Sequence, residues 1–88
     1  MPELRLTRRA KEDLVALPEI VREAVVETLT LIALEPESVG KRLVGRVYGL
    51  WSARVGNYRV LYTIEPAGVV VRAIRHWGVA YGGRRPRP

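Results

Sequence analysis

The chain of 88 residues is long enough for one small domain, and its 48% of hydrophobic residues is enough for a packed core. It contains no cysteine and a single histidine, which excludes disulfides, thiolate metal sites and histidine clusters. Its net charge of +6 is unevenly divided: residues 1–39 contain five basic and eight acidic side chains, and residues 40–88 contain ten basic and one acidic.

The first part of the chain predicts a short strand followed by a helical hairpin. Residues 3–6 alternate polar and apolar side chains, as a half-buried strand does. Thr7 is a candidate N-cap for a first helix, because its hydroxyl can accept a hydrogen bond from a free amide of the first turn. Pro18 ends that helix and can begin the next, since the first turn of a helix does not need the missing N–H. With almost no loop between them, the two helices should lie antiparallel.

The second predicted helix, residues 19–34, is more apolar than a single contact requires. One stripe at helical spacing should pack on a sheet: Val21, Val25, Leu29 and Ile32. Further apolar residues widen that stripe: Ile20, Ala24, Leu31 and Leu34. These extra side chains predict either a deeply buried helix or a contact with a partner.

After Gly40 the pattern changes to short β-branched runs between glycines, which is typical of an antiparallel meander. We expect strands at about 47–55, 57–65 and 69–76, with turns at 56–57 and 66–68. The last of these strands is almost continuously apolar, which indicates a central strand covered on both faces. Helices that precede strands in this way predict an α+β fold.

The expected architecture is therefore a short N-terminal strand and a two-helix hairpin packed on one face of a twisted antiparallel sheet of three to four further strands. We expect a single domain over residues 1–81. Residues 82–88, with the sequence GGRRPRP, should form a flexible basic tail. No apolar run approaches the ~20 residues of a membrane span, and residues 1–14 lack the apolar core of a secretory signal, so a cytoplasmic protein is expected.

The basic second half of the chain indicates an anionic partner, with nucleic acid as the leading candidate. A surface that serves only solubility is the alternative, but such a surface would not separate the charges so completely between the two halves. The question is then which of the ten basic side chains converge on one site.

The stretch RVGNYRVLYTI, followed by a glycine turn, VVVRAIRH and a tyrosine five residues after the histidine, resembles the RelE/ParE toxin superfamily over roughly residues 3–81. The resemblance implies the toxin component of a type II toxin–antitoxin system. The RelE branch consists of mRNA interferases, endoribonucleases that cut mRNA on the ribosome and are neutralised by an antitoxin protein. The ParE branch has the same fold and inhibits DNA gyrase instead.

The RelE-type reaction requires few catalytic side chains, because RNA carries its own nucleophile. The 2′-OH attacks the adjacent phosphorus, the transition state is pentacoordinate and highly anionic, and a 5′-OH is released. Fixed cations that hold the phosphate oxygens, with a proton donor and acceptor, are sufficient, so no metal or cofactor is expected. Arginine suits the first role because its planar fork binds phosphate oxygens bidentately and stays charged.

By resemblance, four side chains are the catalytic candidates. Arg59, in NYRVLY, occupies the position of the family's phosphate-binding arginine, and Arg54 matches a basic position one strand earlier. Tyr81 corresponds to a C-terminal tyrosine that stacks on a base or assists proton transfer, and His76 matches a histidine common near the end of related chains. The alternatives are ordinary: surface charges for the arginines, a core tyrosine, and a hydrogen-bonded structural histidine.

Further RNA contacts are expected from a second set of residues: Arg75, Trp77, Arg46, Lys41 and Arg42. Trp77 can stack on an unpaired base or seat an antitoxin segment. Alternation along the strand should turn Arg75 away from His76. The chain departs from the family where many members carry basic residues, with Ser52 in the first long strand and Trp77–Gly78 after the histidine.

The sequence therefore leaves three functions open. The leading prediction is a metal-independent endoribonuclease that cleaves mRNA, with the ribosome, mRNA and a cognate antitoxin as partners. The second is a gyrase inhibitor of the ParE type without nuclease activity, and the third is an inactive member that only binds its antitoxin. The antitoxin is expected to present an acidic amphipathic segment to the basic face.

Overall fold

The structure, a computed structural model, describes residues 3–44 and 49–76. Its elements in chain order are β1 (Glu3–Leu6), α1 (Arg8–Ala16), α2 (Glu19–Leu34), α3 (Pro36–Val39), β2 (Lys41–Arg42), β3 (Trp51–Val55), β4 (Tyr58–Glu65) and β5 (Gly68–His76). The strands form one sheet in the order β1-β5-β4-β3-β2. β1 is parallel to β5, and the other neighbours are antiparallel.

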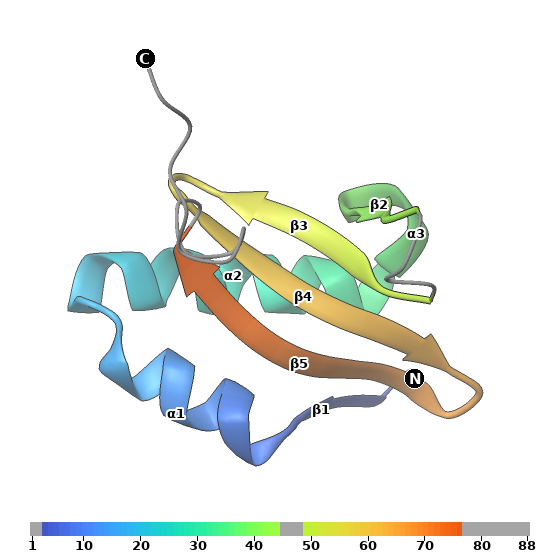
Figure 1. The fold of residues 1–88 in the computed structure, drawn as a ribbon, viewed down its shortest axis with the longest axis horizontal. Helices are drawn as coiled ribbons and strands as arrows, with labels where there is room; N and C mark the ends of the chain where they lie inside the picture. Colours follow the sequence, from blue (N-terminus) through green and yellow to red (C-terminus); the bar gives the residue numbers. More distant parts are fainter. Residues whose placement is uncertain (1–2, 45–48, 77–88) are drawn as a thin grey trace.

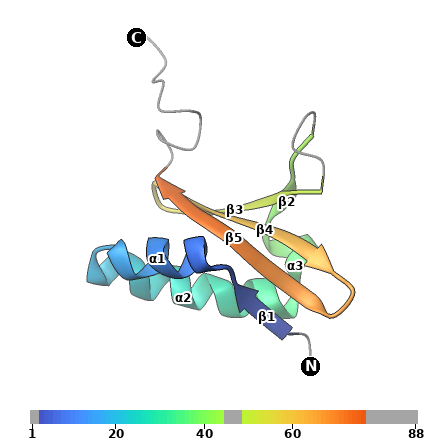
Figure 2. The same ribbon diagram turned by 60° about the horizontal axis from the view of Figure 1, so that its bottom comes forward.

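The two long helices lie on one face of the sheet, which leaves the opposite face of β3, β4 and β5 without a helical cover (Figures 1 and 2). The predicted α+β architecture, with its N-terminal strand, helical hairpin and four further strands, is confirmed. In the part of the chain that the structure describes, no helix is long and apolar enough to cross a lipid bilayer.

Thr7 joins the start of α1 to the sheet. Its Oγ1 accepts a hydrogen bond from the backbone N–H of Ala10 at 3.1 Å, as predicted for an N-cap. The same hydroxyl donates to the carbonyl of Arg72 at 3.0 Å, and the Thr7 N–H donates to the carbonyl of Val71 at 3.0 Å. One residue thus caps the helix and aligns it with β5.

The turn between the helices is closed by Arg22. Its Nη1 donates to the carbonyls of Val15 and Leu17, at 3.1 and 3.0 Å, and so satisfies backbone groups that the end of α1 leaves unpaired. Pro18 precedes the first residue of α2, and α2 covers the predicted range. Pro36 begins the short helix α3.

The core lies between the helices and the sheet. The stripe predicted for α2 packs inward, with Val25, Leu29 and Ile32 buried. In β4, Val60 and Tyr62 are fully buried while Arg59, Leu61 and Thr63 are half-buried, so alternation along this strand is as predicted. β5 lies between β1 and β4, and Val69–Val71 are buried, which confirms a central strand.

Some boundaries differ from the prediction. The strand expected from residue 47 begins at Trp51, since residues 49 and 50 are not in a strand and residues 45–48 lie outside the described residues. The elements α3 and β2 were not predicted, because four and two residues are too short to show a periodic pattern. The domain limit at residue 81 and the tail over residues 82–88 also lie outside the described residues and stay predictions.

Asp13 makes a second connection between α1 and β5, and its removal should destabilise the fold. Its Oδ2 accepts a hydrogen bond from the Ile74 N–H at 2.9 Å. Ile74 lies beyond Val71, the last residue of β5 that pairs with β1. Asp13→Ala would leave this half-buried N–H without its acceptor, which should lower the free energy of unfolding by about 1–3 kcal/mol. Urea unfolding measures the change.

Asp13→Asn is the matched control, because its amide oxygen can still accept the Ile74 N–H. It should cost clearly less than Asp13→Ala. Equal midpoints for the wild type and Asp13→Ala would show that this hydrogen bond contributes nothing to stability.

Candidate functional site

The strand register places three arginines side by side on three adjacent strands. Arg54 of β3 is the direct partner of Arg59 of β4, and Arg59 is the direct partner of Arg75 of β5. Direct partners point to the same face of a sheet, and Val60, next to Arg59, is buried against the helices. Arg54, Arg59 and Arg75 therefore form a row on the open face, which we call the arginine row.

The three positive charges of the arginine row repel one another. Like charges directly opposite one another on neighbouring strands destabilise a sheet by roughly 0.2–1 kcal/mol per pair. An anion bound among the guanidinium groups would offset this mutual repulsion. Phosphate fits, since arginine binds two of its oxygens at once.

Arg59, the middle member of the row, is held from the neighbouring strand. Its Nη1 donates to Ser52 Oγ at 3.0 Å. Arg59 is half-buried and Ser52 is buried, with 6% of its surface exposed. Arg54 is exposed, and its Nε donates to the carbonyl of Gly56 at 3.3 Å. Gly56 has a φ of +59° in the two-residue β3–β4 turn, a conformation that favours glycine.

A hollow of about 400 Å³ opens beside Arg54 and Arg59. The described residues that line it are Val39, Lys41, Arg42, Leu43, Val44, Ser52, Arg54 and Arg59. Four of these eight carry a positive charge and none carries a negative one. Lys41 is the register partner of Ser52, so β2 extends the open face toward this hollow. We call it the basic pocket.

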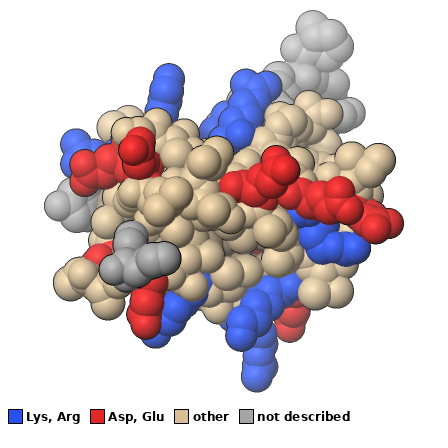
Figure 3. Space-filling model, turned by 180° about the vertical axis from the view of Figure 1, so that it is seen from behind, with Lys and Arg blue, Asp and Glu red and all other residues tan. Residues whose placement is uncertain are grey.

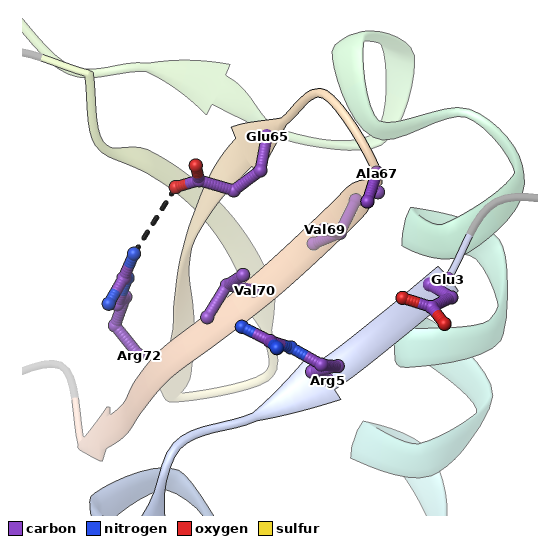
Figure 4. Close-up of a pocket in the computed structure, with 8 residues that line it drawn as sticks. Glu3, Arg5, Glu65, Ala67, Val69, Val70 and Arg72 are labelled. Carbon is purple, nitrogen blue, oxygen red and sulfur yellow. Dashed lines mark hydrogen bonds and ion pairs between the residues drawn. The ribbon is translucent and has the colours of Figure 1, made fainter.

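A second hollow, of about 200 Å³, lies near the turn between β4 and β5 and has a different character (Figure 4). Its lining includes Arg5 and Arg72 but also Glu3 and Glu65. Arg72 Nη2 and Glu65 Oε2 form an ion pair at 3.2 Å. Because its charges are of both signs, this hollow has no preference for an anion, and the basic pocket is the better candidate site.

His76 lies on the other side of the sheet from the arginine row. It is the register partner of Tyr58, and their rings make an edge contact with centroids 5.1 Å apart. Tyr58 directly precedes Arg59, and His76 directly follows Arg75. Alternation along each strand therefore directs both rings to the helix face. The predicted separation of Arg75 from His76 is confirmed, and this geometry favours the structural interpretation of His76 over proton transfer beside Arg59.

The remaining predicted site residues divide into two groups. Lys41 and Arg42 line the basic pocket, and Arg75 belongs to the arginine row. Tyr81, Trp77 and Arg46 lie outside the described residues, so their proposed roles stay predictions. Over residues 3–44 and 49–76, no group of three or more His, Cys, Asp or Glu side chains is arranged to hold a metal ion.

Ser52 is the contact that sequence reasoning missed. The sequence distinguishes this residue only as a serine where many family members are basic. The available signal was spacing: Ser52 is two residues before Arg54 and therefore shares its face, across the turn from Arg59.

The helix side of the molecule differs from the open face. Acidic and basic side chains both lie on it, with uncharged surface between them (Figure 3). The extra apolar residues of α2 are not deeply buried: Ile20, Leu31 and Leu34 are 82%, 54% and 60% exposed. Deep burial, one of the two explanations for these residues, is therefore wrong, and a partner contact remains.

Both the sequence and the fold are similar to those of known proteins. The sequence profile of the family described as "ParE toxin of type II toxin-antitoxin system, parDE" matches residues 4–81. Toxin RelG of Mycobacterium tuberculosis is 40% identical over 73 residues, which are 82% of this chain and 84% of that protein.

Solved structures point the same way. A chain of the toxin–antitoxin complex RelBE2 from Mycobacterium tuberculosis superposes with a TM-score of 0.79 at 39% identity, over 86% of this chain and 99% of that one. The archaeal RelE–RelB complex from Pyrococcus horikoshii gives a TM-score of 0.73 at 21% identity, over 88% and 96%, which shows a shared fold. The chain therefore belongs to the RelE/ParE superfamily, the toxins of type II toxin–antitoxin systems.

Proposed function

We propose that this toxin is an endoribonuclease that cleaves mRNA on the ribosome, with the scissile phosphate bound at the arginine row. The observation that carries the proposal is the convergence of Arg54, Arg59 and Arg75 on the open face, next to a basic pocket whose described lining contains no carboxylate. Fixed cations at the place where negative charge develops are the main requirement of this reaction.

In the proposed reaction the 2′-oxygen attacks the adjacent phosphorus as the bond to the 5′-oxygen breaks. The 2′-OH loses its proton to a base, and the leaving 5′-oxygen gains one, which gives a 2′,3′-cyclic phosphate and a 5′-OH. Arg59 holds the non-bridging oxygens, whose charge rises in the transition state. Lys41 and Arg42 contact neighbouring phosphates, and Tyr81 is the candidate for proton transfer.

The test is incubation of the purified protein with translating ribosomes, followed by mapping of the mRNA ends. New 5′-OH ends within the coding sequence are expected. Intact transcripts at toxin concentrations that arrest growth would contradict the proposal.

A gyrase inhibitor is the second candidate, because the matching family profile is named for ParE. This function predicts inhibition of DNA supercoiling that survives Arg59→Ala. The nuclease predicts no such inhibition, so one supercoiling assay separates the two.

We further propose that a cognate antitoxin covers the exposed apolar residues of α2. RelBE2 and the archaeal RelE–RelB structure are toxin–antitoxin complexes. An amphipathic antitoxin helix fits an exposed apolar stripe on a helix.

Leu31→Asp should therefore weaken the antitoxin complex at least about tenfold, since a central anchor residue of an interface contributes about 2 kcal/mol or more. Leu31 is 54% exposed, so the variant should fold. Calorimetric titration with the antitoxin measures the change. Val15→Asp, at a 74% exposed position on α1, is the control. Unchanged affinity in Leu31→Asp would place the antitoxin on another surface.

A further inference from the structure

We propose that Ser52 is a positioning residue for Arg59: its hydroxyl oxygen fixes the guanidinium group so that the basic pocket presents a preset fork to a phosphate. The inference rests on the proposed function, because it concerns the phosphate-binding arginine of that site. It assigns a role to a residue at which this chain departs from the basic residues of many family members.

The first support is the contact itself. Arg59 Nη1 on β4 donates a hydrogen bond to Ser52 Oγ on the adjacent strand β3, at 3.0 Å. A guanidinium carries five N–H donors in one rigid plane, so fixing one of them sets the directions of the others. A long flexible side chain that is ordered before the ligand arrives loses less conformational freedom on binding.

The second support is burial. Among the described residues that are buried, Ser52, with 6% of its surface exposed, is the one polar side chain apart from the hydroxyl group of Tyr62. Its neighbour Ala53 is 1% exposed and packs in the core on the opposite face. A buried hydroxyl is costly unless it forms a hydrogen bond, so an apolar residue would serve packing at least as well. The hydroxyl is accounted for by its bond to Arg59.

The third support is location. Ser52 lines the basic pocket together with Arg54 and Arg59, and its register partner on β2 is Lys41. The oxygen that orients Arg59 is neutral, so it adds no negative charge to the pocket. A carboxylate in its place would also hold the guanidinium but would compete with phosphate for it.

The test is a double-mutant cycle on the binding of a short 2′-O-methyl RNA, which cannot be cleaved because its nucleophile is blocked. Ser52→Val and Ser52→Thr are the matched variants, since they have the same shape and differ in the hydroxyl group. Ser52→Val should weaken binding about 3–10-fold and Ser52→Thr should bind like the wild type, as expected for a charge-assisted hydrogen bond. Urea midpoints show that each variant is folded.

The cycle separates positioning from a general structural effect. If Ser52 acts through Arg59, Ser52→Val should have no further effect on RNA binding in the Arg59→Ala background. The effects of substitutions at two residues in contact are not additive. Equal losses in both backgrounds, or equal binding by the Val and Thr variants, would overturn the inference.

The outcome for the proposed function is read separately. A wild-type protein that binds the 2′-O-methyl RNA but leaves mRNA intact on ribosomes removes the nuclease and leaves the cycle valid. A wild-type protein that does not bind this RNA overturns the inference about Ser52, and the nuclease is then judged by the ribosome assay alone.

Discussion

Arg59→Ala should lower the rate of mRNA cleavage at least about 100-fold, the loss typical of removing one fixed donor to a developing anion. Arg59 is the middle residue of the arginine row and lines the basic pocket. Arg59 is half-buried, and charge interactions are stronger there than in bulk water. The loss should appear in the rate at saturating mRNA, because the interaction strengthens in the transition state.

Two controls show whether the effect is specific. Arg59→Lys keeps the charge but loses the planar fork, so its rate should lie between those of the wild type and Arg59→Ala. Arg72→Ala removes an arginine of the neighbouring strand β5. Arg72 pairs with Glu65 and lies outside the basic pocket. Cleavage by Arg72→Ala should remain close to that of the wild type.

Stability is not expected to explain the loss of activity in Arg59→Ala. The substitution relieves repulsion from Arg54 and Arg75 but leaves Ser52 without its hydrogen-bond donor, and these two effects oppose each other. A folded Arg59→Ala variant that cleaves mRNA within about threefold of the wild type would remove Arg59 from the proposed mechanism, since such a loss is far below that of a transition-state donor.

Tyr62 should be the most sensitive position for stability. It is fully buried, its ring stacks on Trp51 with centroids 6.3 Å apart, and its hydroxyl donates to the Pro36 carbonyl at 2.6 Å. Tyr62→Ala should cost about 3–5 kcal/mol, as large-to-small aromatic substitutions in cores do. That is a large part of the 5–15 kcal/mol by which domains are typically stable. Tyr62→Phe should cost about 1–3 kcal/mol, because it leaves the Pro36 carbonyl unpaired.

The Tyr62 hydroxyl lies next to the segment that leads into β2. It ties β4 to α3 at Pro36, and a Cβ at Gly40 would overlap the hydroxyl oxygen and lie 2.9 Å from the Ser52 carbonyl. Gly40 connects α3 to β2, which carries Lys41 and Arg42. Tyr62→Phe should therefore weaken RNA binding in addition to lowering the urea midpoint. Wild-type stability in Tyr62→Phe would show that this contact is dispensable.

The same hydroxyl predicts a dependence on pH. Burial raises the pKa of Tyr62, and a backbone hydrogen bond from Gly40 partly opposes the rise. Because the folded pKa lies above the unfolded value of about 10, this contribution to stability is complete below pH 10 and is lost as the pH rises through the folded pKa. Tyr62→Phe should lose less stability than the wild type over that range, as measured by unfolding at pH 8 to 11.

The elements that the sequence predicted well are those whose signals are local. Thr7 and Pro18 mark helix ends through their own hydrogen-bonding chemistry, and the α2 range follows from spacing alone. The pairing of Arg54 with Arg59 was also accessible, because a two-residue turn at 56–57 makes these residues direct partners. Their approach on one face is therefore a consequence of a short stretch of chain.

The position of Arg75 required the structure. From the turn at 66–67, regular pairing of β4 with β5 would place Ile74 opposite Arg59. The register instead shifts between Leu61 and Tyr62, so that Arg75 becomes the partner of Arg59. An extra residue in one strand of a pair reverses the facing of every residue beyond it. This irregularity directs Ile74 into the core and Arg75 onto the open face.

The amino-acid sequence by itself predicted the fold class and the pairing of the two arginines joined by the β3–β4 turn, because caps, periodicity and turn residues act over a few positions. The superfamily followed from the resemblance of whole motifs to a known family. Two features depended on contacts between distant segments: the third arginine and the helix-side position of His76. The bond from Arg59 to Ser52 lies within one hairpin, but the burial that accompanies it was decided by the packed structure. The reason is physical, since the register of two strands and the burial of a hydroxyl are set by how the whole sheet packs.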